Sequence, residues 1–160
     1  MHTLGYSRET PPETISSRVG AAYLFAIETG MRAGEICSLE WRYVNERHVH
    51  LPRTKNGHVR DVPLSVEARR IIEQLRSLTG DEETVFGVST ASLDALFRKA
   101  KRLALIEDLH FHDTRREALT RLSKVFDVME LARISGHRDL RVLQNVYYAP
   151  SVKDLADKLG

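Results

Sequence analysis

Apolar residues recur at helical spacing in three stretches of the first two thirds of the chain. In residues 14–30 they fall every three or four positions and stop at Gly30, which predicts an amphipathic helix with one face on a core. A short helix is predicted directly after this glycine. Two longer helices are predicted over residues 65–78, with Ser65 as the N-terminal cap, and over residues 89–105.

Alternating apolar and polar positions between the first two long helices indicate β-strands. Residues 47–52 and 58–64 alternate in this way, which is typical of half-buried strands. The Thr-Lys-Asn-Gly segment 54–57 joins them and carries an Asn-Gly turn signal, so Lys55 is predicted at the tip of a hairpin. Residues 84–86 are a candidate third strand. The predicted fold class is mainly α with a small antiparallel β-sheet (α+β).

Residues 109–148 contain His112, Arg115, His137 and the adjacent tyrosines Tyr147 and Tyr148. His112 and Arg115 stand at i and i+3 at the start of a predicted helix, so both side chains can project toward a common point. His137 follows a glycine that can end the preceding helix, and Tyr147 lies near the end of another helical run. This arrangement suits an anion such as phosphate, with donors on one side and a hydroxyl nucleophile on the other.

The start of the helix after His112 also has a purely structural explanation. Asp113 or Thr114 can cap it, and Thr114 with Glu117 fits the capping-box pattern. A histidine before a helix is more often a satisfied polar residue than a catalytic one.

Length and composition indicate one domain. The chain has 160 residues and is 42% hydrophobic, enough for a compact unit with its own core. Residues 1–13 are polar and contain prolines, so they are expected to be a linker remnant or flexible N-terminus before a domain spanning residues 14–160. The longest apolar run, residues 19–27, is too short to cross a bilayer, and no secretory signal is recognised. The single cysteine, Cys37, favours a reducing cytosolic setting.

Positive charge is concentrated in the C-terminal part, although the net charge is only +2. Residues 1–96 carry 11 Lys+Arg and 13 Asp+Glu, whereas residues 97–160 carry 13 and 9. Such a cluster suits a DNA phosphate backbone, but a charge run can equally be a solvated helix face. The predicted DNA-binding residues are Arg98, Lys99, Lys101, Arg102 and Arg116.

Taken in order, these segments resemble the catalytic domain of the tyrosine recombinases, the phage-integrase family. Residues 29–35 (TGMRAGE) match the family's first arginine box, TGxRxxE, and are followed by LxW. The TKNG turn continues into RDVPL at residues 60–64, as in the family's lysine hairpin. Residues 111–115 (FHDTR) match the H-x-x-R box, and residues 135–140 (SGHRDL) resemble the LGH-S-x-I segment. The resemblance covers nearly the whole chain.

The resemblance implies a nucleophilic tyrosine that forms a covalent 3′-phosphotyrosine with DNA. Arg32 and Arg115 would stabilise the charge that develops on the non-bridging phosphate oxygens, because guanidinium groups are permanently charged bidentate donors. His137 would donate a further hydrogen bond, and His112 would help to accept the tyrosine proton. Tyr147, ten residues after His137, fits a spacing common in the family.

Four further positions complete the implied site. Lys55 would protonate the departing 5′ oxygen, and Glu35 would orient Arg32 or His112. Tyr148 is the alternative nucleophile. Arg116 stands where the family often has a second histidine, which removes no named catalytic role. No metal or other cofactor is expected, since the HExxH, GxxxxGK[ST] and GxGxxG motifs are all lacking.

Structural explanations remain open for the individual positions. An arginine after a helix break is usually a surface residue, and a lysine beside a turn is most often only solubilising. At the level of function, the predicted activity is that of a site-specific recombinase, acting without metal or ATP. The alternatives are a type IB topoisomerase, which shares the chemistry but relaxes supercoils, and a catalytically silent DNA-binding prophage remnant.

The resemblance also implies partners. The expected partner is double-stranded DNA carrying an attachment site, on which the full-length protein would assemble as a tetramer. Accessory DNA-bending or directionality proteins are a further expectation, with no membrane association and a cytoplasmic, nucleoid-associated location. Family members usually carry an additional N-terminal core-binding domain. Its absence here suggests a fragment that is poorly active alone.

Overall fold

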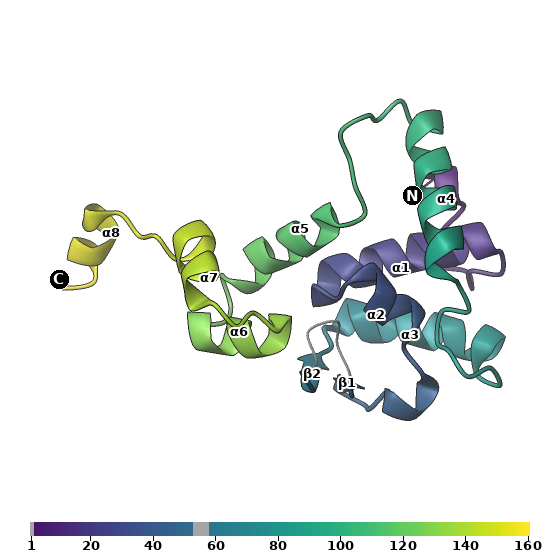
Figure 1. The fold of residues 1–160 in the computed structure, drawn as a ribbon, viewed down its shortest axis with the longest axis horizontal. Helices are drawn as coiled ribbons and strands as arrows, with labels where there is room; N and C mark the ends of the chain where they lie inside the picture. The colour runs from purple at the N-terminus through teal and green to yellow at the C-terminus, as the bar shows by residue number, and fades with distance from the viewer. Residues whose placement is uncertain (1, 53–57) are drawn as a thin grey trace.

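The computed structural model describes residues 2–52 and 58–160 and is mainly helical (Figure 1). In chain order the elements are η1 (His2–Leu4), α1 (Ile15–Thr29), α2 (Ala33–Cys37), η2 (Trp41–Tyr43), β1 (His48–Leu51), β2 (Arg60–Pro63), α3 (Val66–Thr79), α4 (Thr90–Leu103), α5 (Asp113–Leu122), α6 (Val128–Ser135), α7 (Leu140–Tyr147) and α8 (Val152–Asp157). The predicted fold class, mainly α with a small antiparallel sheet, is therefore confirmed.

Local signals in the sequence account for the ends of the long helices. Thr14 caps α1 by accepting the Ser17 backbone N–H, and Gly30 ends it in the left-handed conformation (φ 68°), which glycine adopts without steric strain. Ser65 caps α3 through the backbone N–H of Ala68. Helix α4 ends at Leu103 rather than at the predicted residue 105, because Leu105 itself has a positive φ of 55° that cannot continue a helix.

The two strands form the predicted antiparallel pair. His48 lies opposite Pro63 and Leu51 opposite Arg60, and the inward positions of both strands are buried. The turn that holds Lys55 lies outside the described residues. The expected third strand at residues 84–86 is wrong: in the described part of the chain Thr84 forms an isolated bridge with Glu40, and the Val85 backbone N–H donates to the Leu39 carbonyl oxygen at 2.8 Å, without a continuous strand.

One hydrophobic core, organised around α1, holds the N-terminal two thirds of the chain. Helices α3, α4 and α5 all contact α1, and Phe25 of α1 packs against Phe86 with ring centroids 5.3 Å apart. The expectation of a flexible N-terminal linker is wrong for Leu4 and Tyr6. Both are buried in this core, and the Tyr6 hydroxyl donates to Gln74 Oε1 of α3 at 2.8 Å.

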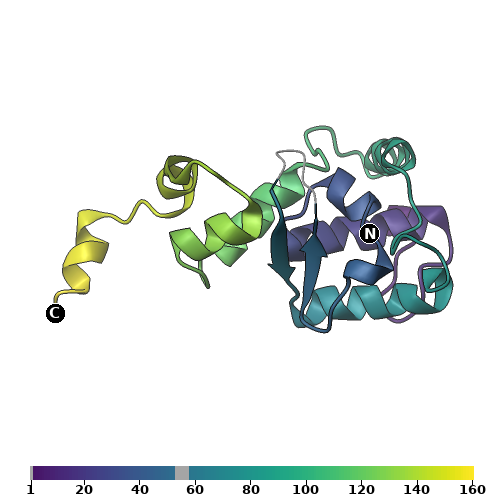
Figure 2. The ribbon, with the colours of Figure 1, turned by 60° about the horizontal axis from the view of Figure 1, so that its bottom comes forward.

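The C-terminal helices extend from one end of this body (Figures 1 and 2). A second, small apolar cluster joins α5, α6 and α7; its buried members are Leu119, Leu131, Ala132 and Leu143. Helix α8 contributes no buried residue and lies at the far end of the molecule. Helix α6 also contacts strand β2, which brings the C-terminal helices beside the hairpin. None of the described helices is long and apolar enough to cross a membrane.

Candidate active site

Four of the predicted catalytic residues line one cavity of about 490 Å³. His112 and Arg115 come from the start of α5, His137 from the loop after α6, and Tyr147 from the last position of α7. Arg116 also lines it. Residues separated by 35 positions in the sequence thus converge because α6 and α7 fold back onto α5 through the small apolar cluster.

Arg115 is held in place by the main chain of two other segments. Its side chain is buried, with 4% of the residue exposed. One terminal nitrogen donates to the carbonyl oxygen of Gly30, and Nη2 donates to the carbonyl oxygen of Ser135 at 2.6 Å. Burial, with the nearby Arg32 and Arg60 guanidinium groups, lowers the Arg115 pKa to about 10. The guanidinium remains charged at neutral pH and is fixed between the ends of α1 and α6.

Arg32 lies at the N-terminus of α2 and is supported by Glu35. Its backbone N–H donates to Glu35 Oε2 at 2.9 Å, and Nη1 lies 3.5 Å from Oε1. Arg32 is linked to the site through Glu35, which also binds the buried Arg60, and its charge contributes to lowering the pKa values of Arg115 and His137. Glu35 was predicted to orient either Arg32 or His112, and its contact with Arg32 is present. Within the described part of the chain, the Glu35 carboxylate accepts hydrogen bonds from Arg32 and Arg60, and none from His112.

Arg60 is a site residue that the sequence pattern indicated only as part of a hairpin motif. It is 7% exposed and donates from both terminal nitrogens to Glu35, at 2.8 Å each. Its Nε donates to the carbonyl oxygen of Ile134 at 2.9 Å. The inward position of Arg60 in an alternating strand was the available signal, because an arginine on a buried face needs a partner.

The Glu35 carboxylate is stabilised in its charged form. Burial raises its pKa, but hydrogen bonds from the Arg60 side chain and the Arg32 backbone outweigh burial, so the pKa lies below its ordinary value. Glu35 and Arg60 together tie α2, β2 and the end of α6 to one another.

His137 is neutral at physiological pH in this structure. Burial lowers its pKa to about 4, and the charges of Arg115, Arg32 and Arg60 act in the same direction. Its Nδ1 lies 2.7 Å from the Ser135 hydroxyl. Three arginines around a neutral histidine form a concentrated positive site suited to an anion.

The low pKa of His137 predicts a pH-dependent loss of stability. As pH falls from about 6.5 to about 4, the unfolded chain binds a proton at this residue while the folded chain does not, so the free energy of unfolding decreases. The upper limit is roughly 3 kcal/mol, reduced to on the order of 1 kcal/mol by solvent contact of the half-buried ring. Urea unfolding between pH 4 and 7 should show that the free energy of unfolding decreases less steeply with falling pH for His137→Gln than for the wild type. The same pH dependence of the free energy of unfolding in both proteins would contradict this.

The two adjacent tyrosines have different environments. Tyr147 lines the cavity, and its pKa is raised by burial, against the opposing charges of Arg116 and Arg115. The Tyr148 hydroxyl instead donates to the carbonyl oxygen of Phe126. Tyr148 is thereby tied to the loop before α6, and Tyr147 is the tyrosine that faces the arginines.

His112 lies at the exposed rim of the site, and the predicted capping box beside it is wrong. His112 itself is the residue before α5 and provides no side-chain cap. The Thr114 hydroxyl donates to the carbonyl oxygen of Phe111, and Asp113 accepts the backbone N–H of His110. This leaves the His112 ring at the cavity without a role in capping the helix.

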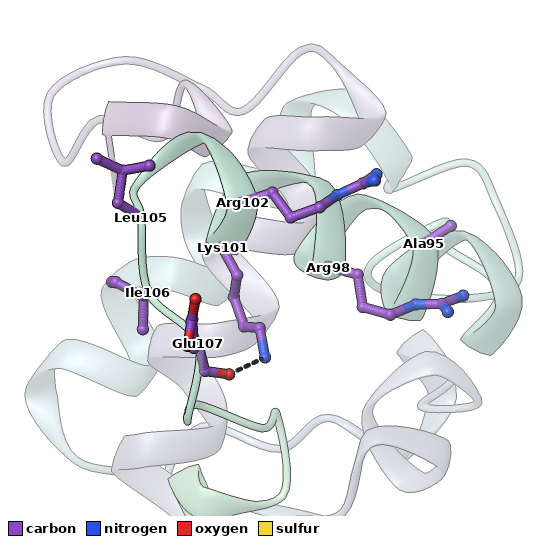
Figure 3. A pocket seen from close by; sticks show the side chains of 7 residues that line it. All are labelled: Ala95, Arg98, Lys101, Arg102, Leu105, Ile106 and Glu107. Atoms are coloured by element: carbon purple, nitrogen blue, oxygen red, sulfur yellow. Dashed lines mark hydrogen bonds between the residues drawn. The ribbon is translucent and has the colours of Figure 1, made fainter.

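Of the residues on α4 predicted to bind DNA, Arg98, Lys101 and Arg102 line a separate cavity of about 770 Å³ (Figure 3), whereas Lys99 is exposed on the same helix. Lys101 turns toward the following loop and donates to the carbonyl oxygens of Glu107, at 3.0 Å, and Leu109. Arg98 pairs with Asp94 at 3.0 Å on the exposed helix face. Lys101 therefore has a structural role that its sequence did not reveal, while Arg102 remains exposed.

Within residues 2–52 and 58–160, no group of three or more His, Cys, Asp or Glu side chains is arranged to hold a metal ion. A reaction without metal stays a prediction, and its chemistry would rest on the guanidinium and imidazole groups described above.

Known proteins resemble this chain in sequence over most of its length. Residues 4–153 match the family described as the phage integrase family. A Haemophilus influenzae protein named "Putative integrase/recombinase" is 56% identical over 149 residues, covering 92% of this chain and 49% of the relative. A shufflon-specific DNA recombinase of Escherichia coli is 45% identical over 124 residues, covering 74% of this chain and 32% of the relative. The chain thus spans about half the length, or less, of these relatives.

Solved structures show the same fold at low sequence identity. The Tn1549 transposon integrase in complex with circular intermediate DNA superposes with a TM-score of 0.72 at 16% identity, covering 99% of this chain and 62% of that one. A lambda integrase tetramer bound to a Holliday junction gives a TM-score of 0.65 at 18% identity, covering 76% and 41%.

Proposed function

The chain belongs to the phage integrase family, and we propose that it carries the strand-cleaving and rejoining site of a site-specific DNA recombinase. The observation that carries this proposal is the convergence of His112, Arg115, His137 and Tyr147 on one cavity. Arg32 is linked to this site through Glu35, which also binds Arg60. Such a site holds a nucleophile and several phosphate donors within reach of one bound group.

In the proposed reaction, the Tyr147 hydroxyl oxygen attacks the scissile phosphorus and the bond to the 5′ oxygen breaks. The product is a 3′-phosphotyrosine and a free 5′ hydroxyl. Arg32 and Arg115 donate to the non-bridging oxygens, where negative charge develops in the transition state. Rejoining is the reverse, with a 5′ hydroxyl attacking the phosphotyrosine, so the bond energy is conserved.

Two proton transfers accompany cleavage. The raised pKa of Tyr147 keeps its phenol protonated in the free protein, so attack requires a proton acceptor, and His112 at the cavity rim is the proposed one. Lys55 is proposed to donate a proton to the departing 5′ oxygen. It lies on the segment that precedes β2, and Arg60 of β2 is bonded to the site itself.

The proposed substrate is duplex DNA carrying an attachment site, bound in the cytoplasm. Arg98, Lys99, Arg102 and Arg116 are proposed to contact its phosphates, as exposed cations do in sequence-independent DNA binding. We also propose that residues 14–160 form the catalytic domain, with Leu4 and Tyr6 as part of it. Assembly as a tetramer on DNA, as in the lambda integrase complex, is proposed for the complete protein, and accessory proteins would direct it.

A covalent-adduct selection from randomised DNA tests this function. The chain is incubated with nicked duplexes of randomised sequence, and complexes that survive denaturing detergent are sequenced. Enrichment of one sequence in a 3′-linked adduct is the expected result, and strand exchange between enriched duplexes would separate a recombinase from a topoisomerase. Duplex binding with no adduct from any sequence would favour the silent DNA-binding module.

Replacing either phosphate-binding arginine by lysine should slow cleavage about a hundredfold or more, because loss of one transition-state donor costs on the order of 3 kcal/mol. Lysine cannot reproduce the two-pronged geometry of a guanidinium. The measurement is the rate of adduct formation by Arg32→Lys and Arg115→Lys on an enriched duplex. Arg141→Lys, on an 82% exposed side chain, is the matched control. A wild-type rate for either site variant would exclude that arginine from the reaction.

The proposed acid can be tested by changing the leaving group. Lys55→Ala should slow cleavage of an ordinary duplex, whereas the defect should shrink on a duplex whose 5′ oxygen is replaced by sulfur, since a thiolate leaves without a proton. Single-turnover cleavage of both substrates is compared. If the defect is the same on both, Lys55 positions DNA and does not supply the proton.

A further inference from the structure

Ser135 occupies a position that the proposed reaction leaves unused. It is the last residue of α6 and is only 2% exposed. It contacts two residues of the candidate site, Arg115 and His137. Its carbonyl oxygen accepts from Arg115 Nη2 at 2.6 Å, and its hydroxyl lies 2.7 Å from His137 Nδ1. The corresponding position of the LGH segment, which SGH resembles here, holds leucine, which has no hydroxyl to offer.

Gly136 makes the Ser135–His137 contact geometrically possible. Its φ of 75° turns the chain at the end of α6, so that the side chains on either side of the glycine meet. A residue with a Cβ would be strained in this left-handed conformation. The left-handed Gly136 at the end of α6 therefore brings Ser135 and His137 into contact.

The donors and acceptors available to the Ser135 hydroxyl and His137 Nδ1 determine which of them donates the hydrogen bond. Among the described residues, His137 Nδ1 is the only hydrogen-bond partner of the Ser135 hydroxyl. If Nδ1 carried the proton, the serine oxygen would accept it and its own buried O–H would be left without an acceptor, which is unfavourable. If the serine donates, both groups are satisfied, and the proton of the neutral ring must then be on Nε2.

We propose that Ser135 is a positioning residue, which donates to His137 Nδ1 and so holds the neutral ring in the tautomer that presents Nε2–H to the scissile phosphate. This inference rests on the proposed function of the cavity. A neutral imidazole has one donor nitrogen, and a phosphate oxygen only accepts. The tautomer therefore decides whether His137 can contribute a hydrogen bond at all. A donor without added charge also avoids further repulsion among Arg32, Arg60 and Arg115.

Nitrogen NMR of the free protein tests the tautomer independently of DNA cleavage. In ¹⁵N-histidine-labelled chain at pH 7, His137 should be protonated at Nε2 and unprotonated at Nδ1. Ser135→Ala should introduce a second tautomer, and Ser135→Thr, which keeps the hydroxyl, should restore the single one. A wild-type ring protonated at Nδ1, or a Ser135→Ala spectrum identical to wild type, would overturn the proposal even if the recombinase function is correct.

Cleavage of an enriched duplex provides the second readout. Adduct formation by Ser135→Ala should be about fivefold to tenfold slower, the effect of losing the orientation given by one hydrogen bond, and Ser135→Thr should recover most of the rate. Ser123→Ala is the matched control, since its hydroxyl also donates at a helix end, to the Thr120 carbonyl. Thermal unfolding of each variant identifies any general loss of stability. A Ser135→Ala rate equal to wild type would overturn the proposal.

Discussion

Tyr147→Phe should abolish the covalent protein–DNA adduct, whereas Tyr148→Phe should retain it. Phenylalanine has no oxygen with which to attack phosphorus, so the loss should be complete within detection. Neighbouring residues on a helix point about 100° apart, and only Tyr147 lines the cavity with Arg115 and His137. The Tyr148 hydroxyl is already bonded to the carbonyl oxygen of Phe126.

The two tyrosine variants serve as controls for each other. Tyr148→Phe loses one hydrogen bond and should lower the free energy of unfolding by about 1 kcal/mol, which thermal unfolding can measure. Peptide mapping of the trapped wild-type adduct should place the nucleotide on Tyr147. Finding it on Tyr148, or an undiminished adduct with Tyr147→Phe, would overturn the assignment.

Arg60→Met should be the most destabilising single change at the site, lowering the free energy of unfolding by about 3–5 kcal/mol. Methionine fills similar space but leaves the buried Glu35 carboxylate without its two strongest donors and the Ile134 carbonyl without Nε. Urea unfolding measures the loss. Arg141→Met breaks an exposed pair with Asp139 and should leave the urea midpoint close to that of the wild type.

A double variant separates stability from chemistry. Arg60→Met combined with Glu35→Leu removes the unpaired charge, so stability should recover substantially. Arg32 would then lack the carboxylate that holds it, and adduct formation should stay slow. Recovery of both stability and cleavage would show that the Arg60–Glu35 pair contributes only to packing and is not needed to hold Arg32 for cleavage. No recovery of stability would assign the loss in Arg60→Met to the Ile134 contact instead.

Local chemistry explains what could be predicted from the sequence. Thr14, Gly30 and Ser65 act on their own neighbouring backbone groups, so the ends of α1 and the start of α3 follow from residues within one turn. The alternation of residues 47–52 and 58–64 likewise predicts the strand pair. The site boxes were found through a family resemblance, since spacing alone could not show that they share a cavity.

Contacts between distant segments could not be predicted from local patterns. Arg60 bonds Glu35 and Ile134 across 25 and 74 positions, and although its inward strand position shows that it needs a partner, no local pattern identifies these two. Tyr6 bonds Gln74 across 68 positions, so a polar N-terminal segment looked loose although it packs on the core. Lys101 looked free for DNA because its carbonyl partners belong to a loop with no regular pattern.

The bond from Arg115 to the Gly30 carbonyl joins positions 85 apart, and this has a consequence during synthesis. Contacts of such long sequence separation form late, because the intervening chain must first be ordered. Helix α1 can leave the ribosome long before Arg115, and the nucleophile follows still later. A nascent or truncated chain therefore carries Arg32 without Arg115, His137 and Tyr147. The cavity proposed to cleave DNA can assemble only after the residues up to Tyr147 have been translated.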